Sequence, residues 1–246
     1  MMKTAFFALT ALSAVPAAHA ASSGGRLSLS LEAGPAWQTR NDFRIPGDGG
    51  TLVEAPAAGP VAAWRATLTL DLGRHQSLRL LAAPLRTEAS FAPREPVVFQ
   101  ELVFPAGRPL DERFVFDSYR LTWYWRFANH GRWSFRLGAT AKLRSAEISL
   151  SGEPGRSVKK NVGFVPLLYA YARYQATDRL ALELEADALA APQGRAEDVS
   201  LKAVLRLRAG VDLDLGYRFL EGGADNDEVY TFATVHYAVA GVRVRF

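Results

Sequence analysis

One histidine and one acidic segment are the residues of this chain that could together carry acid–base chemistry. The segment EGGADNDE holds Glu221, Asp225, Asp227 and Glu228, and His236 follows it in the sequence. A general base must lie within about 3 Å of the proton that it removes, whereas eight residues of extended chain span roughly 27 Å. Gly, Asn and Asp also favour turns. We therefore expect a solvated hairpin loop here. Two carboxylates could hold Ca²⁺ only weakly, so we assign neither a metal nor a cofactor to the chain.

Charged side chains at every second position form a second group of candidate functional residues. In RLALELEAD, Glu183, Glu185 and Asp187 alternate with leucine and alanine, and the flanking segments offer Arg173 and Lys202. Opposite charges on neighbouring strands stabilise a sheet, and buried charges need partners. We expect these residues to pair across neighbouring strands as one lumen-lining charge network. Its expected members are Arg120, Arg126, Arg136, Lys142, Arg144, Arg173, Glu183, Glu185, Asp187, Lys202, Arg206 and Arg208.

The elements that position these charges alternate with period two. In YRLTWYWRF, Leu121, Trp123 and Trp125 alternate with Arg120 and Tyr124. A helix would mix the two sets on every face, whereas a strand separates them. Ten segments show this pattern and are predicted as strands, near residues 26–40, 60–72, 76–90, 113–127, 132–150, 162–175, 179–190, 198–208, 211–221 and 229–246.

The connections between these strands alternate in length. Tight connections fall at 73–75, 128–131, 176–178 and 209–210, and longer ones at 41–59, 91–112, 151–161, 191–197 and 222–228. This alternation is typical of an up-and-down antiparallel β-barrel. We predict ten strands, with eight or twelve as alternatives, and both ends of the chain at the short-turn end.

Alternation alone leaves two barrels possible: a soluble lipocalin-type barrel with the apolar face inside, and a transmembrane barrel with that face outside. The apolar face carries almost no charge over the middle of each strand. Large aromatic residues, such as Trp123, Trp125, Phe127, Trp133 and Phe135, stand beside a turn, where an interfacial girdle would lie. Many strands also exceed the 9–11 residues that cross a bilayer. We therefore predict an all-β fold, a transmembrane up-and-down antiparallel β-barrel.

The first twenty residues have the pattern of a secretory signal peptide. Lys3 precedes an apolar run, and Ala18-His19-Ala20 gives a small-x-small cleavage pattern. Residues 1–20 are assigned to the signal and residues 21–246 to one barrel domain. The chain contains no cysteine and has a net charge of +4 with its arginines spread along the sequence. The lack of cysteine excludes disulfides, and the spread of the arginines argues against a nucleic-acid partner.

The final segment, FATVHYAVAGVRVRF, alternates up to Phe246. It resembles the C-terminal assembly signal of bacterial outer-membrane β-barrel proteins, the small porin-like barrels of the Gram-negative cell envelope, although Val244 stands where many members carry an aromatic residue. The resemblance implies an outer-membrane location, export through the cleaved signal, recognition of Phe246 by the barrel-assembly machinery, and contact with membrane lipid and lipopolysaccharide. It identifies no subfamily and no oligomeric state.

Two enzyme classes of this group have catalytic motifs that the sequence matches poorly. Omptin proteases need an Asp pair and an Asp-His pair at the extracellular mouth. Asp212 and Asp214 stand beside a tight turn, which would place them at the opposite, periplasmic end. Lipid A deacylases use a His-x-Ser pair, and Ala238 replaces the serine two residues after His236. The sequence therefore favours a non-enzymatic barrel.

Two predicted loops have unusual compositions. The segment 96–107 is dense in apolar residues, which indicates a hairpin, a lid over the mouth or a docking surface. The segment GEPGRSVKKN offers Arg156, Lys159 and Lys160, which could pair with lipopolysaccharide phosphates.

The leading functional expectation is an envelope or surface-interaction barrel whose polar lumen is filled by paired charges. A narrow anion-favouring channel for small solutes and a lipid-modifying or proteolytic enzyme remain the alternatives.

Overall fold

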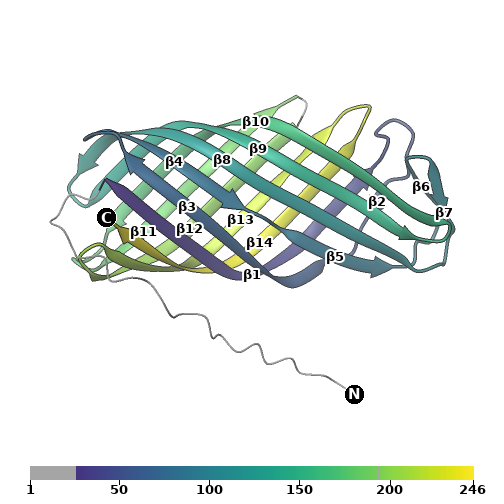
Figure 1. The fold of residues 1–246 in the computed structure, drawn as a ribbon, viewed down its shortest axis with the longest axis horizontal. Coiled ribbons are helices and arrows are strands. Elements are labelled where there is room, and N and C mark those ends of the chain that lie inside the picture. The colour runs from purple at the N-terminus through teal and green to yellow at the C-terminus, as the bar shows by residue number, and fades with distance from the viewer. Residues whose placement is uncertain (1–25, 193) are drawn as a thin grey trace, which may run out of the picture.

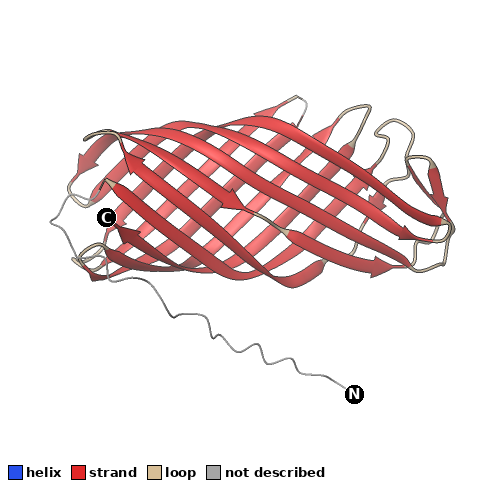
Figure 2. Ribbon diagram, in the orientation of Figure 1, coloured by secondary structure: helices blue, strands red, loops and turns tan. Residues whose placement is uncertain are grey.

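Strands make up most of the chain that the computed structural model describes, residues 26–192 and 194–246 (Figures 1 and 2). The predicted signal segment 1–20 lies outside these residues. Within them, no helix has the length and apolarity needed to span a membrane. The strands are β1 (Leu27–Arg44), β2 (Val53–Glu54), β3 (Ala58–Asp71), β4 (Gln76–Ala83), β5 (Arg86–Phe91), β6 (Val97–Phe99), β7 (Leu102–Phe104), β8 (Leu110–His130), β9 (Trp133–Gly152), β10 (Gly155–Gln175), β11 (Leu180–Ala191), β12 (Gly194–Arg208), β13 (Val211–Asp225) and β14 (Tyr230–Arg245).

The sheet closes into a barrel because β1 pairs antiparallel with β14. The register runs from Ser28 opposite Arg245 to Arg44 opposite Tyr230. At one end, Phe246 donates its backbone N–H to the carbonyl of Leu27. The last strand thus completes the wall, and both ends of the described chain lie at the end of the barrel with the tight turns (Figure 1).

Ten strand positions make up the wall, as predicted. β4 and β5 follow one another along β8 and share one position. Leu85 links them by exchanging backbone hydrogen bonds with Phe116 at 2.9 and 3.1 Å. β2 adds only two residues to β1, and β6 and β7 form a separate hairpin. The predicted all-β, up-and-down antiparallel barrel is confirmed.

The strands are longer at the loop end than the sequence indicated. β9 and β10 continue to a tight turn at Glu153 and Pro154, pairing up to Gly152 opposite Gly155. The predicted long connection 151–161 was therefore wrong, because these residues prolong two strands. The connections 191–197 and 222–228 shorten in the same way, since β12 begins at Gly194 and β13 extends to Asp225. The barrel wall consequently rises well above its apolar part at the loop end.

The apolar face of the strands points outward. Trp64, Leu121, Trp123, Leu182 and Leu205 are all exposed on the outer wall. The intervening positions, such as Arg65, Arg120 and Thr122, are buried inside. The transmembrane arrangement of the faces is thus confirmed, and the soluble lipocalin-type alternative is wrong.

Aromatic side chains flank the turn end of this outer apolar belt. Trp133 stacks on Phe135 with ring centroids 5.7 Å apart and also lies 4.9 Å from Tyr174. Trp125 stacks on His75 at 5.6 Å. Rings with one apolar and one polar edge favour the membrane–water interface, so this group has the composition of an interfacial girdle.

At the loop end, the outer wall becomes charged. Arg86 pairs with Asp117, and Arg113 lies 3.8 Å from Glu88. The outward positions of β8 change from charged to apolar between Asp117 and Tyr119. Because charge on a lipid-facing wall costs about 2–4 kcal/mol at the midplane, this change marks one edge of the belt.

The β6–β7 hairpin covers the loop end. Phe99 and Phe104 are buried in one continuous apolar cluster with Phe43 and Ile45 of the first connection, and the rings of Phe43 and Phe99 meet edge to face at 5.9 Å. The same cluster continues to inward-facing Val235. Of the outcomes expected for segment 96–107, the hairpin and the lid are both realised.

Candidate functional site

The lumen is the candidate functional site, and its character changes along the barrel axis. At the turn end it holds a polar vestibule of about 150 Å³, and at the loop end an apolar cavity of about 480 Å³. Between them lies a set of interlocked charged side chains, which we call the ionic plug. Its members are Glu32, Arg65, Arg79, Arg120, Glu185, Asp187, Asp198, Lys202 and Arg218.

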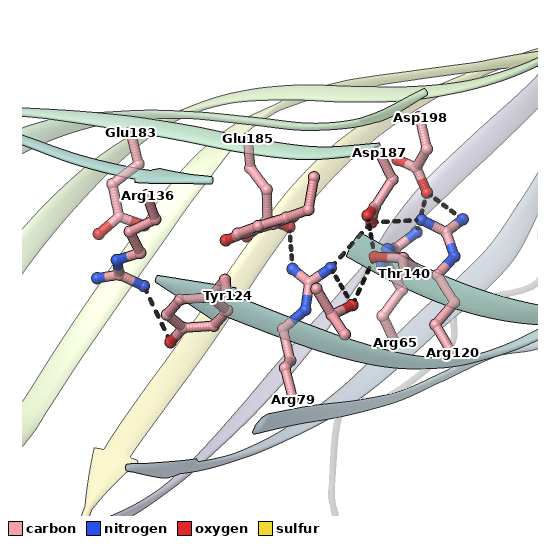
Figure 3. A network of polar contacts seen from close by, with 12 residues as sticks. Arg65, Arg79, Arg120, Tyr124, Arg136, Thr140, Glu183, Glu185, Asp187 and Asp198 are labelled. Atoms are coloured by element: carbon pink, nitrogen blue, oxygen red, sulfur yellow. Dashed lines mark hydrogen bonds and ion pairs between the residues drawn. The ribbon is translucent and has the colours of Figure 1, made fainter. Parts of the chain in front are cut away.

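Two neighbouring aspartates organise the ionic plug. Asp187 of β11 stands directly opposite Asp198 of β12. Two carboxylates in this position repel each other unless cations neutralise them. Arg120 bridges them, with one guanidinium nitrogen 2.9 Å from Asp187 and another 2.5 Å from Asp198. Arg65 and Arg218 also bind Asp198, at 3.0 and 2.7 Å (Figure 3 shows Arg65 and Arg120 there). Three arginines from three other strands thus neutralise one carboxylate.

Asp187 has its own second set of donors. Arg79 donates to it at 2.8 Å, and the Thr140 hydroxyl donates at 2.6 Å. The other guanidinium nitrogen of Arg79 lies 2.8 Å from Glu185, and the guanidinium stands over the Tyr169 ring at 4.5 Å. Figure 3 shows Arg79 reaching across the lumen toward Glu185 and Asp187 of β11.

Glu32 joins the remaining cations. It pairs with Lys202 and with Arg218, whose nitrogen is 3.0 Å from the carboxylate. All three side chains are buried. Glu32, Asp187 and Asp198 each receive at least two charged donors, and several of these donors are shared. The ionic plug is therefore one connected network rather than a row of separate pairs.

The predicted partners within this network were largely wrong. Glu183 does pair with neighbouring Arg173, at 2.5 Å, but also with Arg243 at 2.9 Å. Lys202 binds Glu32 and approaches Asp214 at 3.8 Å instead of pairing with the acids of β11. The reason is geometric: in a narrow closed barrel, long inward side chains reach strands on the far side.

The other predicted lumen residues take varied positions. Arg126 pairs with Asp71 at 2.8 Å near the turn end. Arg136 stacks over Tyr171 at 4.0 Å and forms no ion pair within the described part of the chain. Lys142 and Arg144 face the apolar cavity. Arg206 lies 3.8 Å from Asp212 at the turn-end rim.

Arg208 is exposed at the last position of β12, beyond a register shift. It therefore lies outside the network, and its assignment to the lumen was wrong.

Sequence reasoning missed several members of the network. Glu32, Arg79 and Arg218 are each a charge isolated between apolar or aromatic neighbours, and Asp198 follows Glu197 at the start of an alternating segment. Their alternation parity places them on the inner face, so that parity was the available signal. Their partners could not be read from it, because Glu32 and Arg218 are 186 residues apart in the chain.

The three basic residues of segment 151–161 do not form one loop cluster. Arg156 and Lys160 project outward from β10, 3.7 and 3.5 Å from Glu147. Lys159 has the opposite parity, lines the cavity and lies 3.6 Å from Glu228. Lys159 therefore does not share the outward surface of Arg156 and Lys160.

His236 and the acidic segment do not meet. His236 lies on the outer wall, where its ring nitrogens contact the Tyr217 hydroxyl at 2.5 Å and the Thr39 hydroxyl at 3.0 Å. In the acidic segment, Glu221 instead binds Arg195 at 2.6 Å. No cluster of three or more His, Asp or Glu that could hold a metal occurs within residues 26–192 and 194–246.

One titratable group in the loop-end extension is unusual. Glu112 of β8 is buried, and Asn41 donates to its carboxylate at 2.9 Å. Its other oxygen has no hydrogen-bond partner among the described residues, and neither does the side-chain oxygen of Asn41. Burial raises the pKa of Glu112 from 4.5 to about 7. A protonated Glu112 would supply the missing donor of this pair.

No protein-family model matches the chain. No curated protein matches it either. Among solved structures, the chain is similar to the outer-membrane protease OmpT from Escherichia coli, with a TM-score of 0.55 and 11% identity over 89% of this chain and 96% of that one. It also matches the transport unit of the autotransporter AIDA-I from Escherichia coli (TM-score 0.47, 7% identity, 90% of each chain) and Neisserial surface protein A (0.36, 14%, 89% and 97%). The likeness to OmpT shows that the chain has the fold of the outer-membrane β-barrels.

Proposed function

We propose that this chain is an integral barrel of the bacterial outer membrane whose lumen is closed to ions, and that it acts as an envelope or surface-interaction protein. The exposed apolar belt supports the membrane location, because a closed wall of this composition needs hydrocarbon around it. The tight turns and both ends of the described chain would then face the periplasm, and the long strands and the lid would face outward.

The ionic plug is the observation that carries the closed state. Asp198, Asp187 and Glu32 are each held by at least two cations from other strands. Moving an ion through would require separating these pairs inside a poorly hydrated lumen, where an uncompensated charge costs several kcal/mol. The vestibule at the turn end is lined by arginines, but it ends at the ionic plug.

The loop-end surface is where we propose contacts with the cell envelope. Arg156 and Lys160 project outward just beyond exposed Val162, so they stand beside the headgroups if the belt lies in the bilayer. Each is close to Glu147, which leaves donors free for lipopolysaccharide phosphates. Phe246 and β14 complete the proposal as the segment that the assembly machinery would recognise.

Conductance across planar bilayers tests the closed lumen. We expect the refolded protein to give no stable current steps, and Arg120→Ala to produce them, because this change removes the bridge between the two aspartates. Arg113→Ala, on the outer wall, is the matched control and should stay silent. Steady anion-selective steps from the unaltered protein, unchanged by Arg120→Ala, would contradict the proposal and support a narrow channel instead.

A further inference from the structure

The barrel wall has an unpaired stretch at the loop end, between β10 and β11. Their pairing begins at Gln175 opposite Ala181 and stops at Leu168 opposite Ala188. Beyond that point, residues 155–167 of β10 pair only with β9, and residues 189–191 of β11 pair only with β12. Pro166 lies two residues beyond the last pair, and proline is confined to strand edges because it has no N–H to donate. We call this stretch the β10–β11 gap.

The apolar cavity adjoins this gap. Its lining includes Phe164, Val165 and Pro166 on one side and Leu189, Ala191 and Gly194 on the other. Residues from both edges line one cavity, and among the described residues no backbone pairing joins these edges, so the cavity borders the gap. At the top, by contrast, the lid formed by the β6–β7 hairpin covers the barrel.

The outer rim of the gap is apolar. Val162 and Phe164 of β10 are 67% and 69% exposed, and Leu168 at the end of the paired stretch is 66% exposed. They continue the apolar belt up to Lys160, where the outer wall becomes charged. If the belt lies in the bilayer, the gap opens onto hydrocarbon near one interface and not onto water.

The cavity itself combines apolar walls with two cations at its side nearest the gap. The walls include Ile45, Phe114, Ile148, Leu189, Leu220 and Ala233.

Lys142 is 4% exposed, and among the described residues it has neither an ion-pair nor a hydrogen-bond partner. Its ammonium lies over the Phe116 ring, 4.8 Å from the centroid. Arg144 binds Asn161, but its buried Nε has no hydrogen-bond partner in the part of the chain that the structure describes.

These cations differ from the other charges around the cavity. Arg195 is bound to Glu221, and Lys159 lies near Glu228. Gly163 of β10 allows Arg144 to lie against the edge of the gap, because a Cβ there would be 3.1 Å from the guanidinium. A buried ammonium without a carboxylate is costly, and an anionic group brought by a ligand would satisfy both Lys142 and Arg144.

We propose that this cavity binds a long-chain fatty acid, which reaches it from the membrane through the β10–β11 gap. The carboxylate would pair with Lys142 and Arg144, and the hydrocarbon chain would occupy the apolar part of the cavity. The volume of about 480 Å³ lies in the range of about 300–1,000 Å³ that is usual for small-molecule sites. A single-chain amphiphile fits this space and its two cations better than a lipid with several chains and a bulky headgroup.

Equilibrium binding to the purified full chain tests the ligand class independently of any membrane location. We expect palmitate to bind saturably in detergent solution and hexadecanol, which lacks the carboxylate, to bind more weakly. Lys142→Met keeps the side-chain volume and should raise the dissociation constant for palmitate at least about tenfold, the effect of one lost charged hydrogen bond. The same substitution should leave hexadecanol binding unchanged.

Lys160→Met is the matched control, because Lys160 projects outward and lies outside the cavity; palmitate binding should not change. Ala146→Trp, which fills the cavity without removing a charge, should abolish binding of both probes, and a heat-dependent gel shift verifies that each variant is folded. Absence of saturable palmitate binding, or equal losses for palmitate and hexadecanol in Lys142→Met, would overturn the proposed ligand.

The lateral route has its own test, which rests on the proposed membrane location. The chain contains no cysteine, so a Pro166→Cys and Ala190→Cys pair can be bridged by a short bis-maleimide across the gap. In lipid vesicles, this bridge should slow palmitate uptake about tenfold or more without changing the equilibrium affinity in detergent. An Ala172→Cys and Leu184→Cys pair, placed where β10 and β11 are already hydrogen-bonded, is the control. Unchanged uptake after bridging the gap would overturn the lateral route while leaving the ligand class standing.

Discussion

Asp198 shows how much a single buried carboxylate contributes in this lumen. It accepts from Arg65, Arg120 and Arg218, and all four side chains are buried. Removing one partner of such a network leaves uncompensated charge, which typically costs 3–5 kcal/mol. We therefore regard the ionic plug as both the closure of the lumen and a constraint on the strands that supply it.

The first prediction concerns this residue. Asp198→Asn should lower the free energy of unfolding by about 3–5 kcal/mol, because three guanidinium groups lose their shared carboxylate. Urea titration of the protein in lipid vesicles measures the change. Asp225→Asn, at the exposed end of β13, should change it by less than about 0.5 kcal/mol. Similar effects of the two substitutions would show that the ionic plug does not stabilise the barrel.

A second residue-scale prediction concerns Glu112. Its folded-state pKa is raised from 4.5 to about 7 by burial, so the folded protein holds a proton that the unfolded chain has lost. The stability from this group is fully present below about pH 4.5 and decreases as the pH rises to about 7, by about 3 kcal/mol in total.

Urea titrations between pH 4.5 and pH 8 measure this dependence. Glu112→Gln keeps a donor beside Asn41 without titrating, and it should flatten this part of the pH profile. An unchanged slope in Glu112→Gln would assign the pH dependence to other groups.

At the scale of elements, the β6–β7 hairpin depends on packing rather than on its own ladder. Only three residue pairs join β6 to β7, from Val97 opposite Phe104 to Phe99 opposite Leu102. Isolated two-stranded hairpins are marginally stable in water. The hairpin is ordered because Phe99 and Phe104 are buried beside Phe43 and Ile45.

Phe99→Ala should therefore release the hairpin while leaving the barrel closed. Loss of a buried phenylalanine costs about 3–5 kcal/mol, more than three ladder pairs can offset. Limited proteolysis should then cleave the chain within residues 92–108, with the rest of the barrel resistant. Val103→Ala is the control, because Val103 projects outward from the same hairpin and is exposed. Equal protection of the two variants would contradict the role of Phe99.

At the scale of the whole molecule, the outer apolar belt determines where the protein can be stable. Leu121, Trp123 and Trp125 are exposed along β8, and comparable residues recur around the wall. Such a surface would be unfavourable in water, whereas in hydrocarbon its apolar area needs no further burial and the paired strands satisfy their backbone hydrogen bonds inside the wall.

Leu121→Arg tests this arrangement. The substitution should destabilise the protein in lipid vesicles by about 2–4 kcal/mol, because it places a charge on the lipid face. Val103→Arg, on the lid and outside the belt, should have little effect. If both arginine variants proved as stable as the original in vesicle unfolding, the belt would not be in contact with lipid.

The sequence by itself determined the strands, their faces and the type of barrel. Period-two alternation is local, so a run such as YRLTWYWRF fixes which side chains share a face before any partner strand is known. The charge-free apolar face then distinguished lipid from water as the surroundings. Even the inward positions of Glu32 and Arg218, which were overlooked, follow from parity.

Only the tertiary structure decided which charges meet and where the wall is open. Arg79 reaches Asp187 across the lumen, and the two are 108 residues apart in the sequence; alternation carries no information on register or on contacts across a closed barrel. For the same reason, the sequence did not reveal the lid, the inward direction of the Lys159 side chain or the β10–β11 gap. A strand shows its face in its own residues, but its hydrogen-bond partner and the side chains opposite it exist only after the sheet has closed.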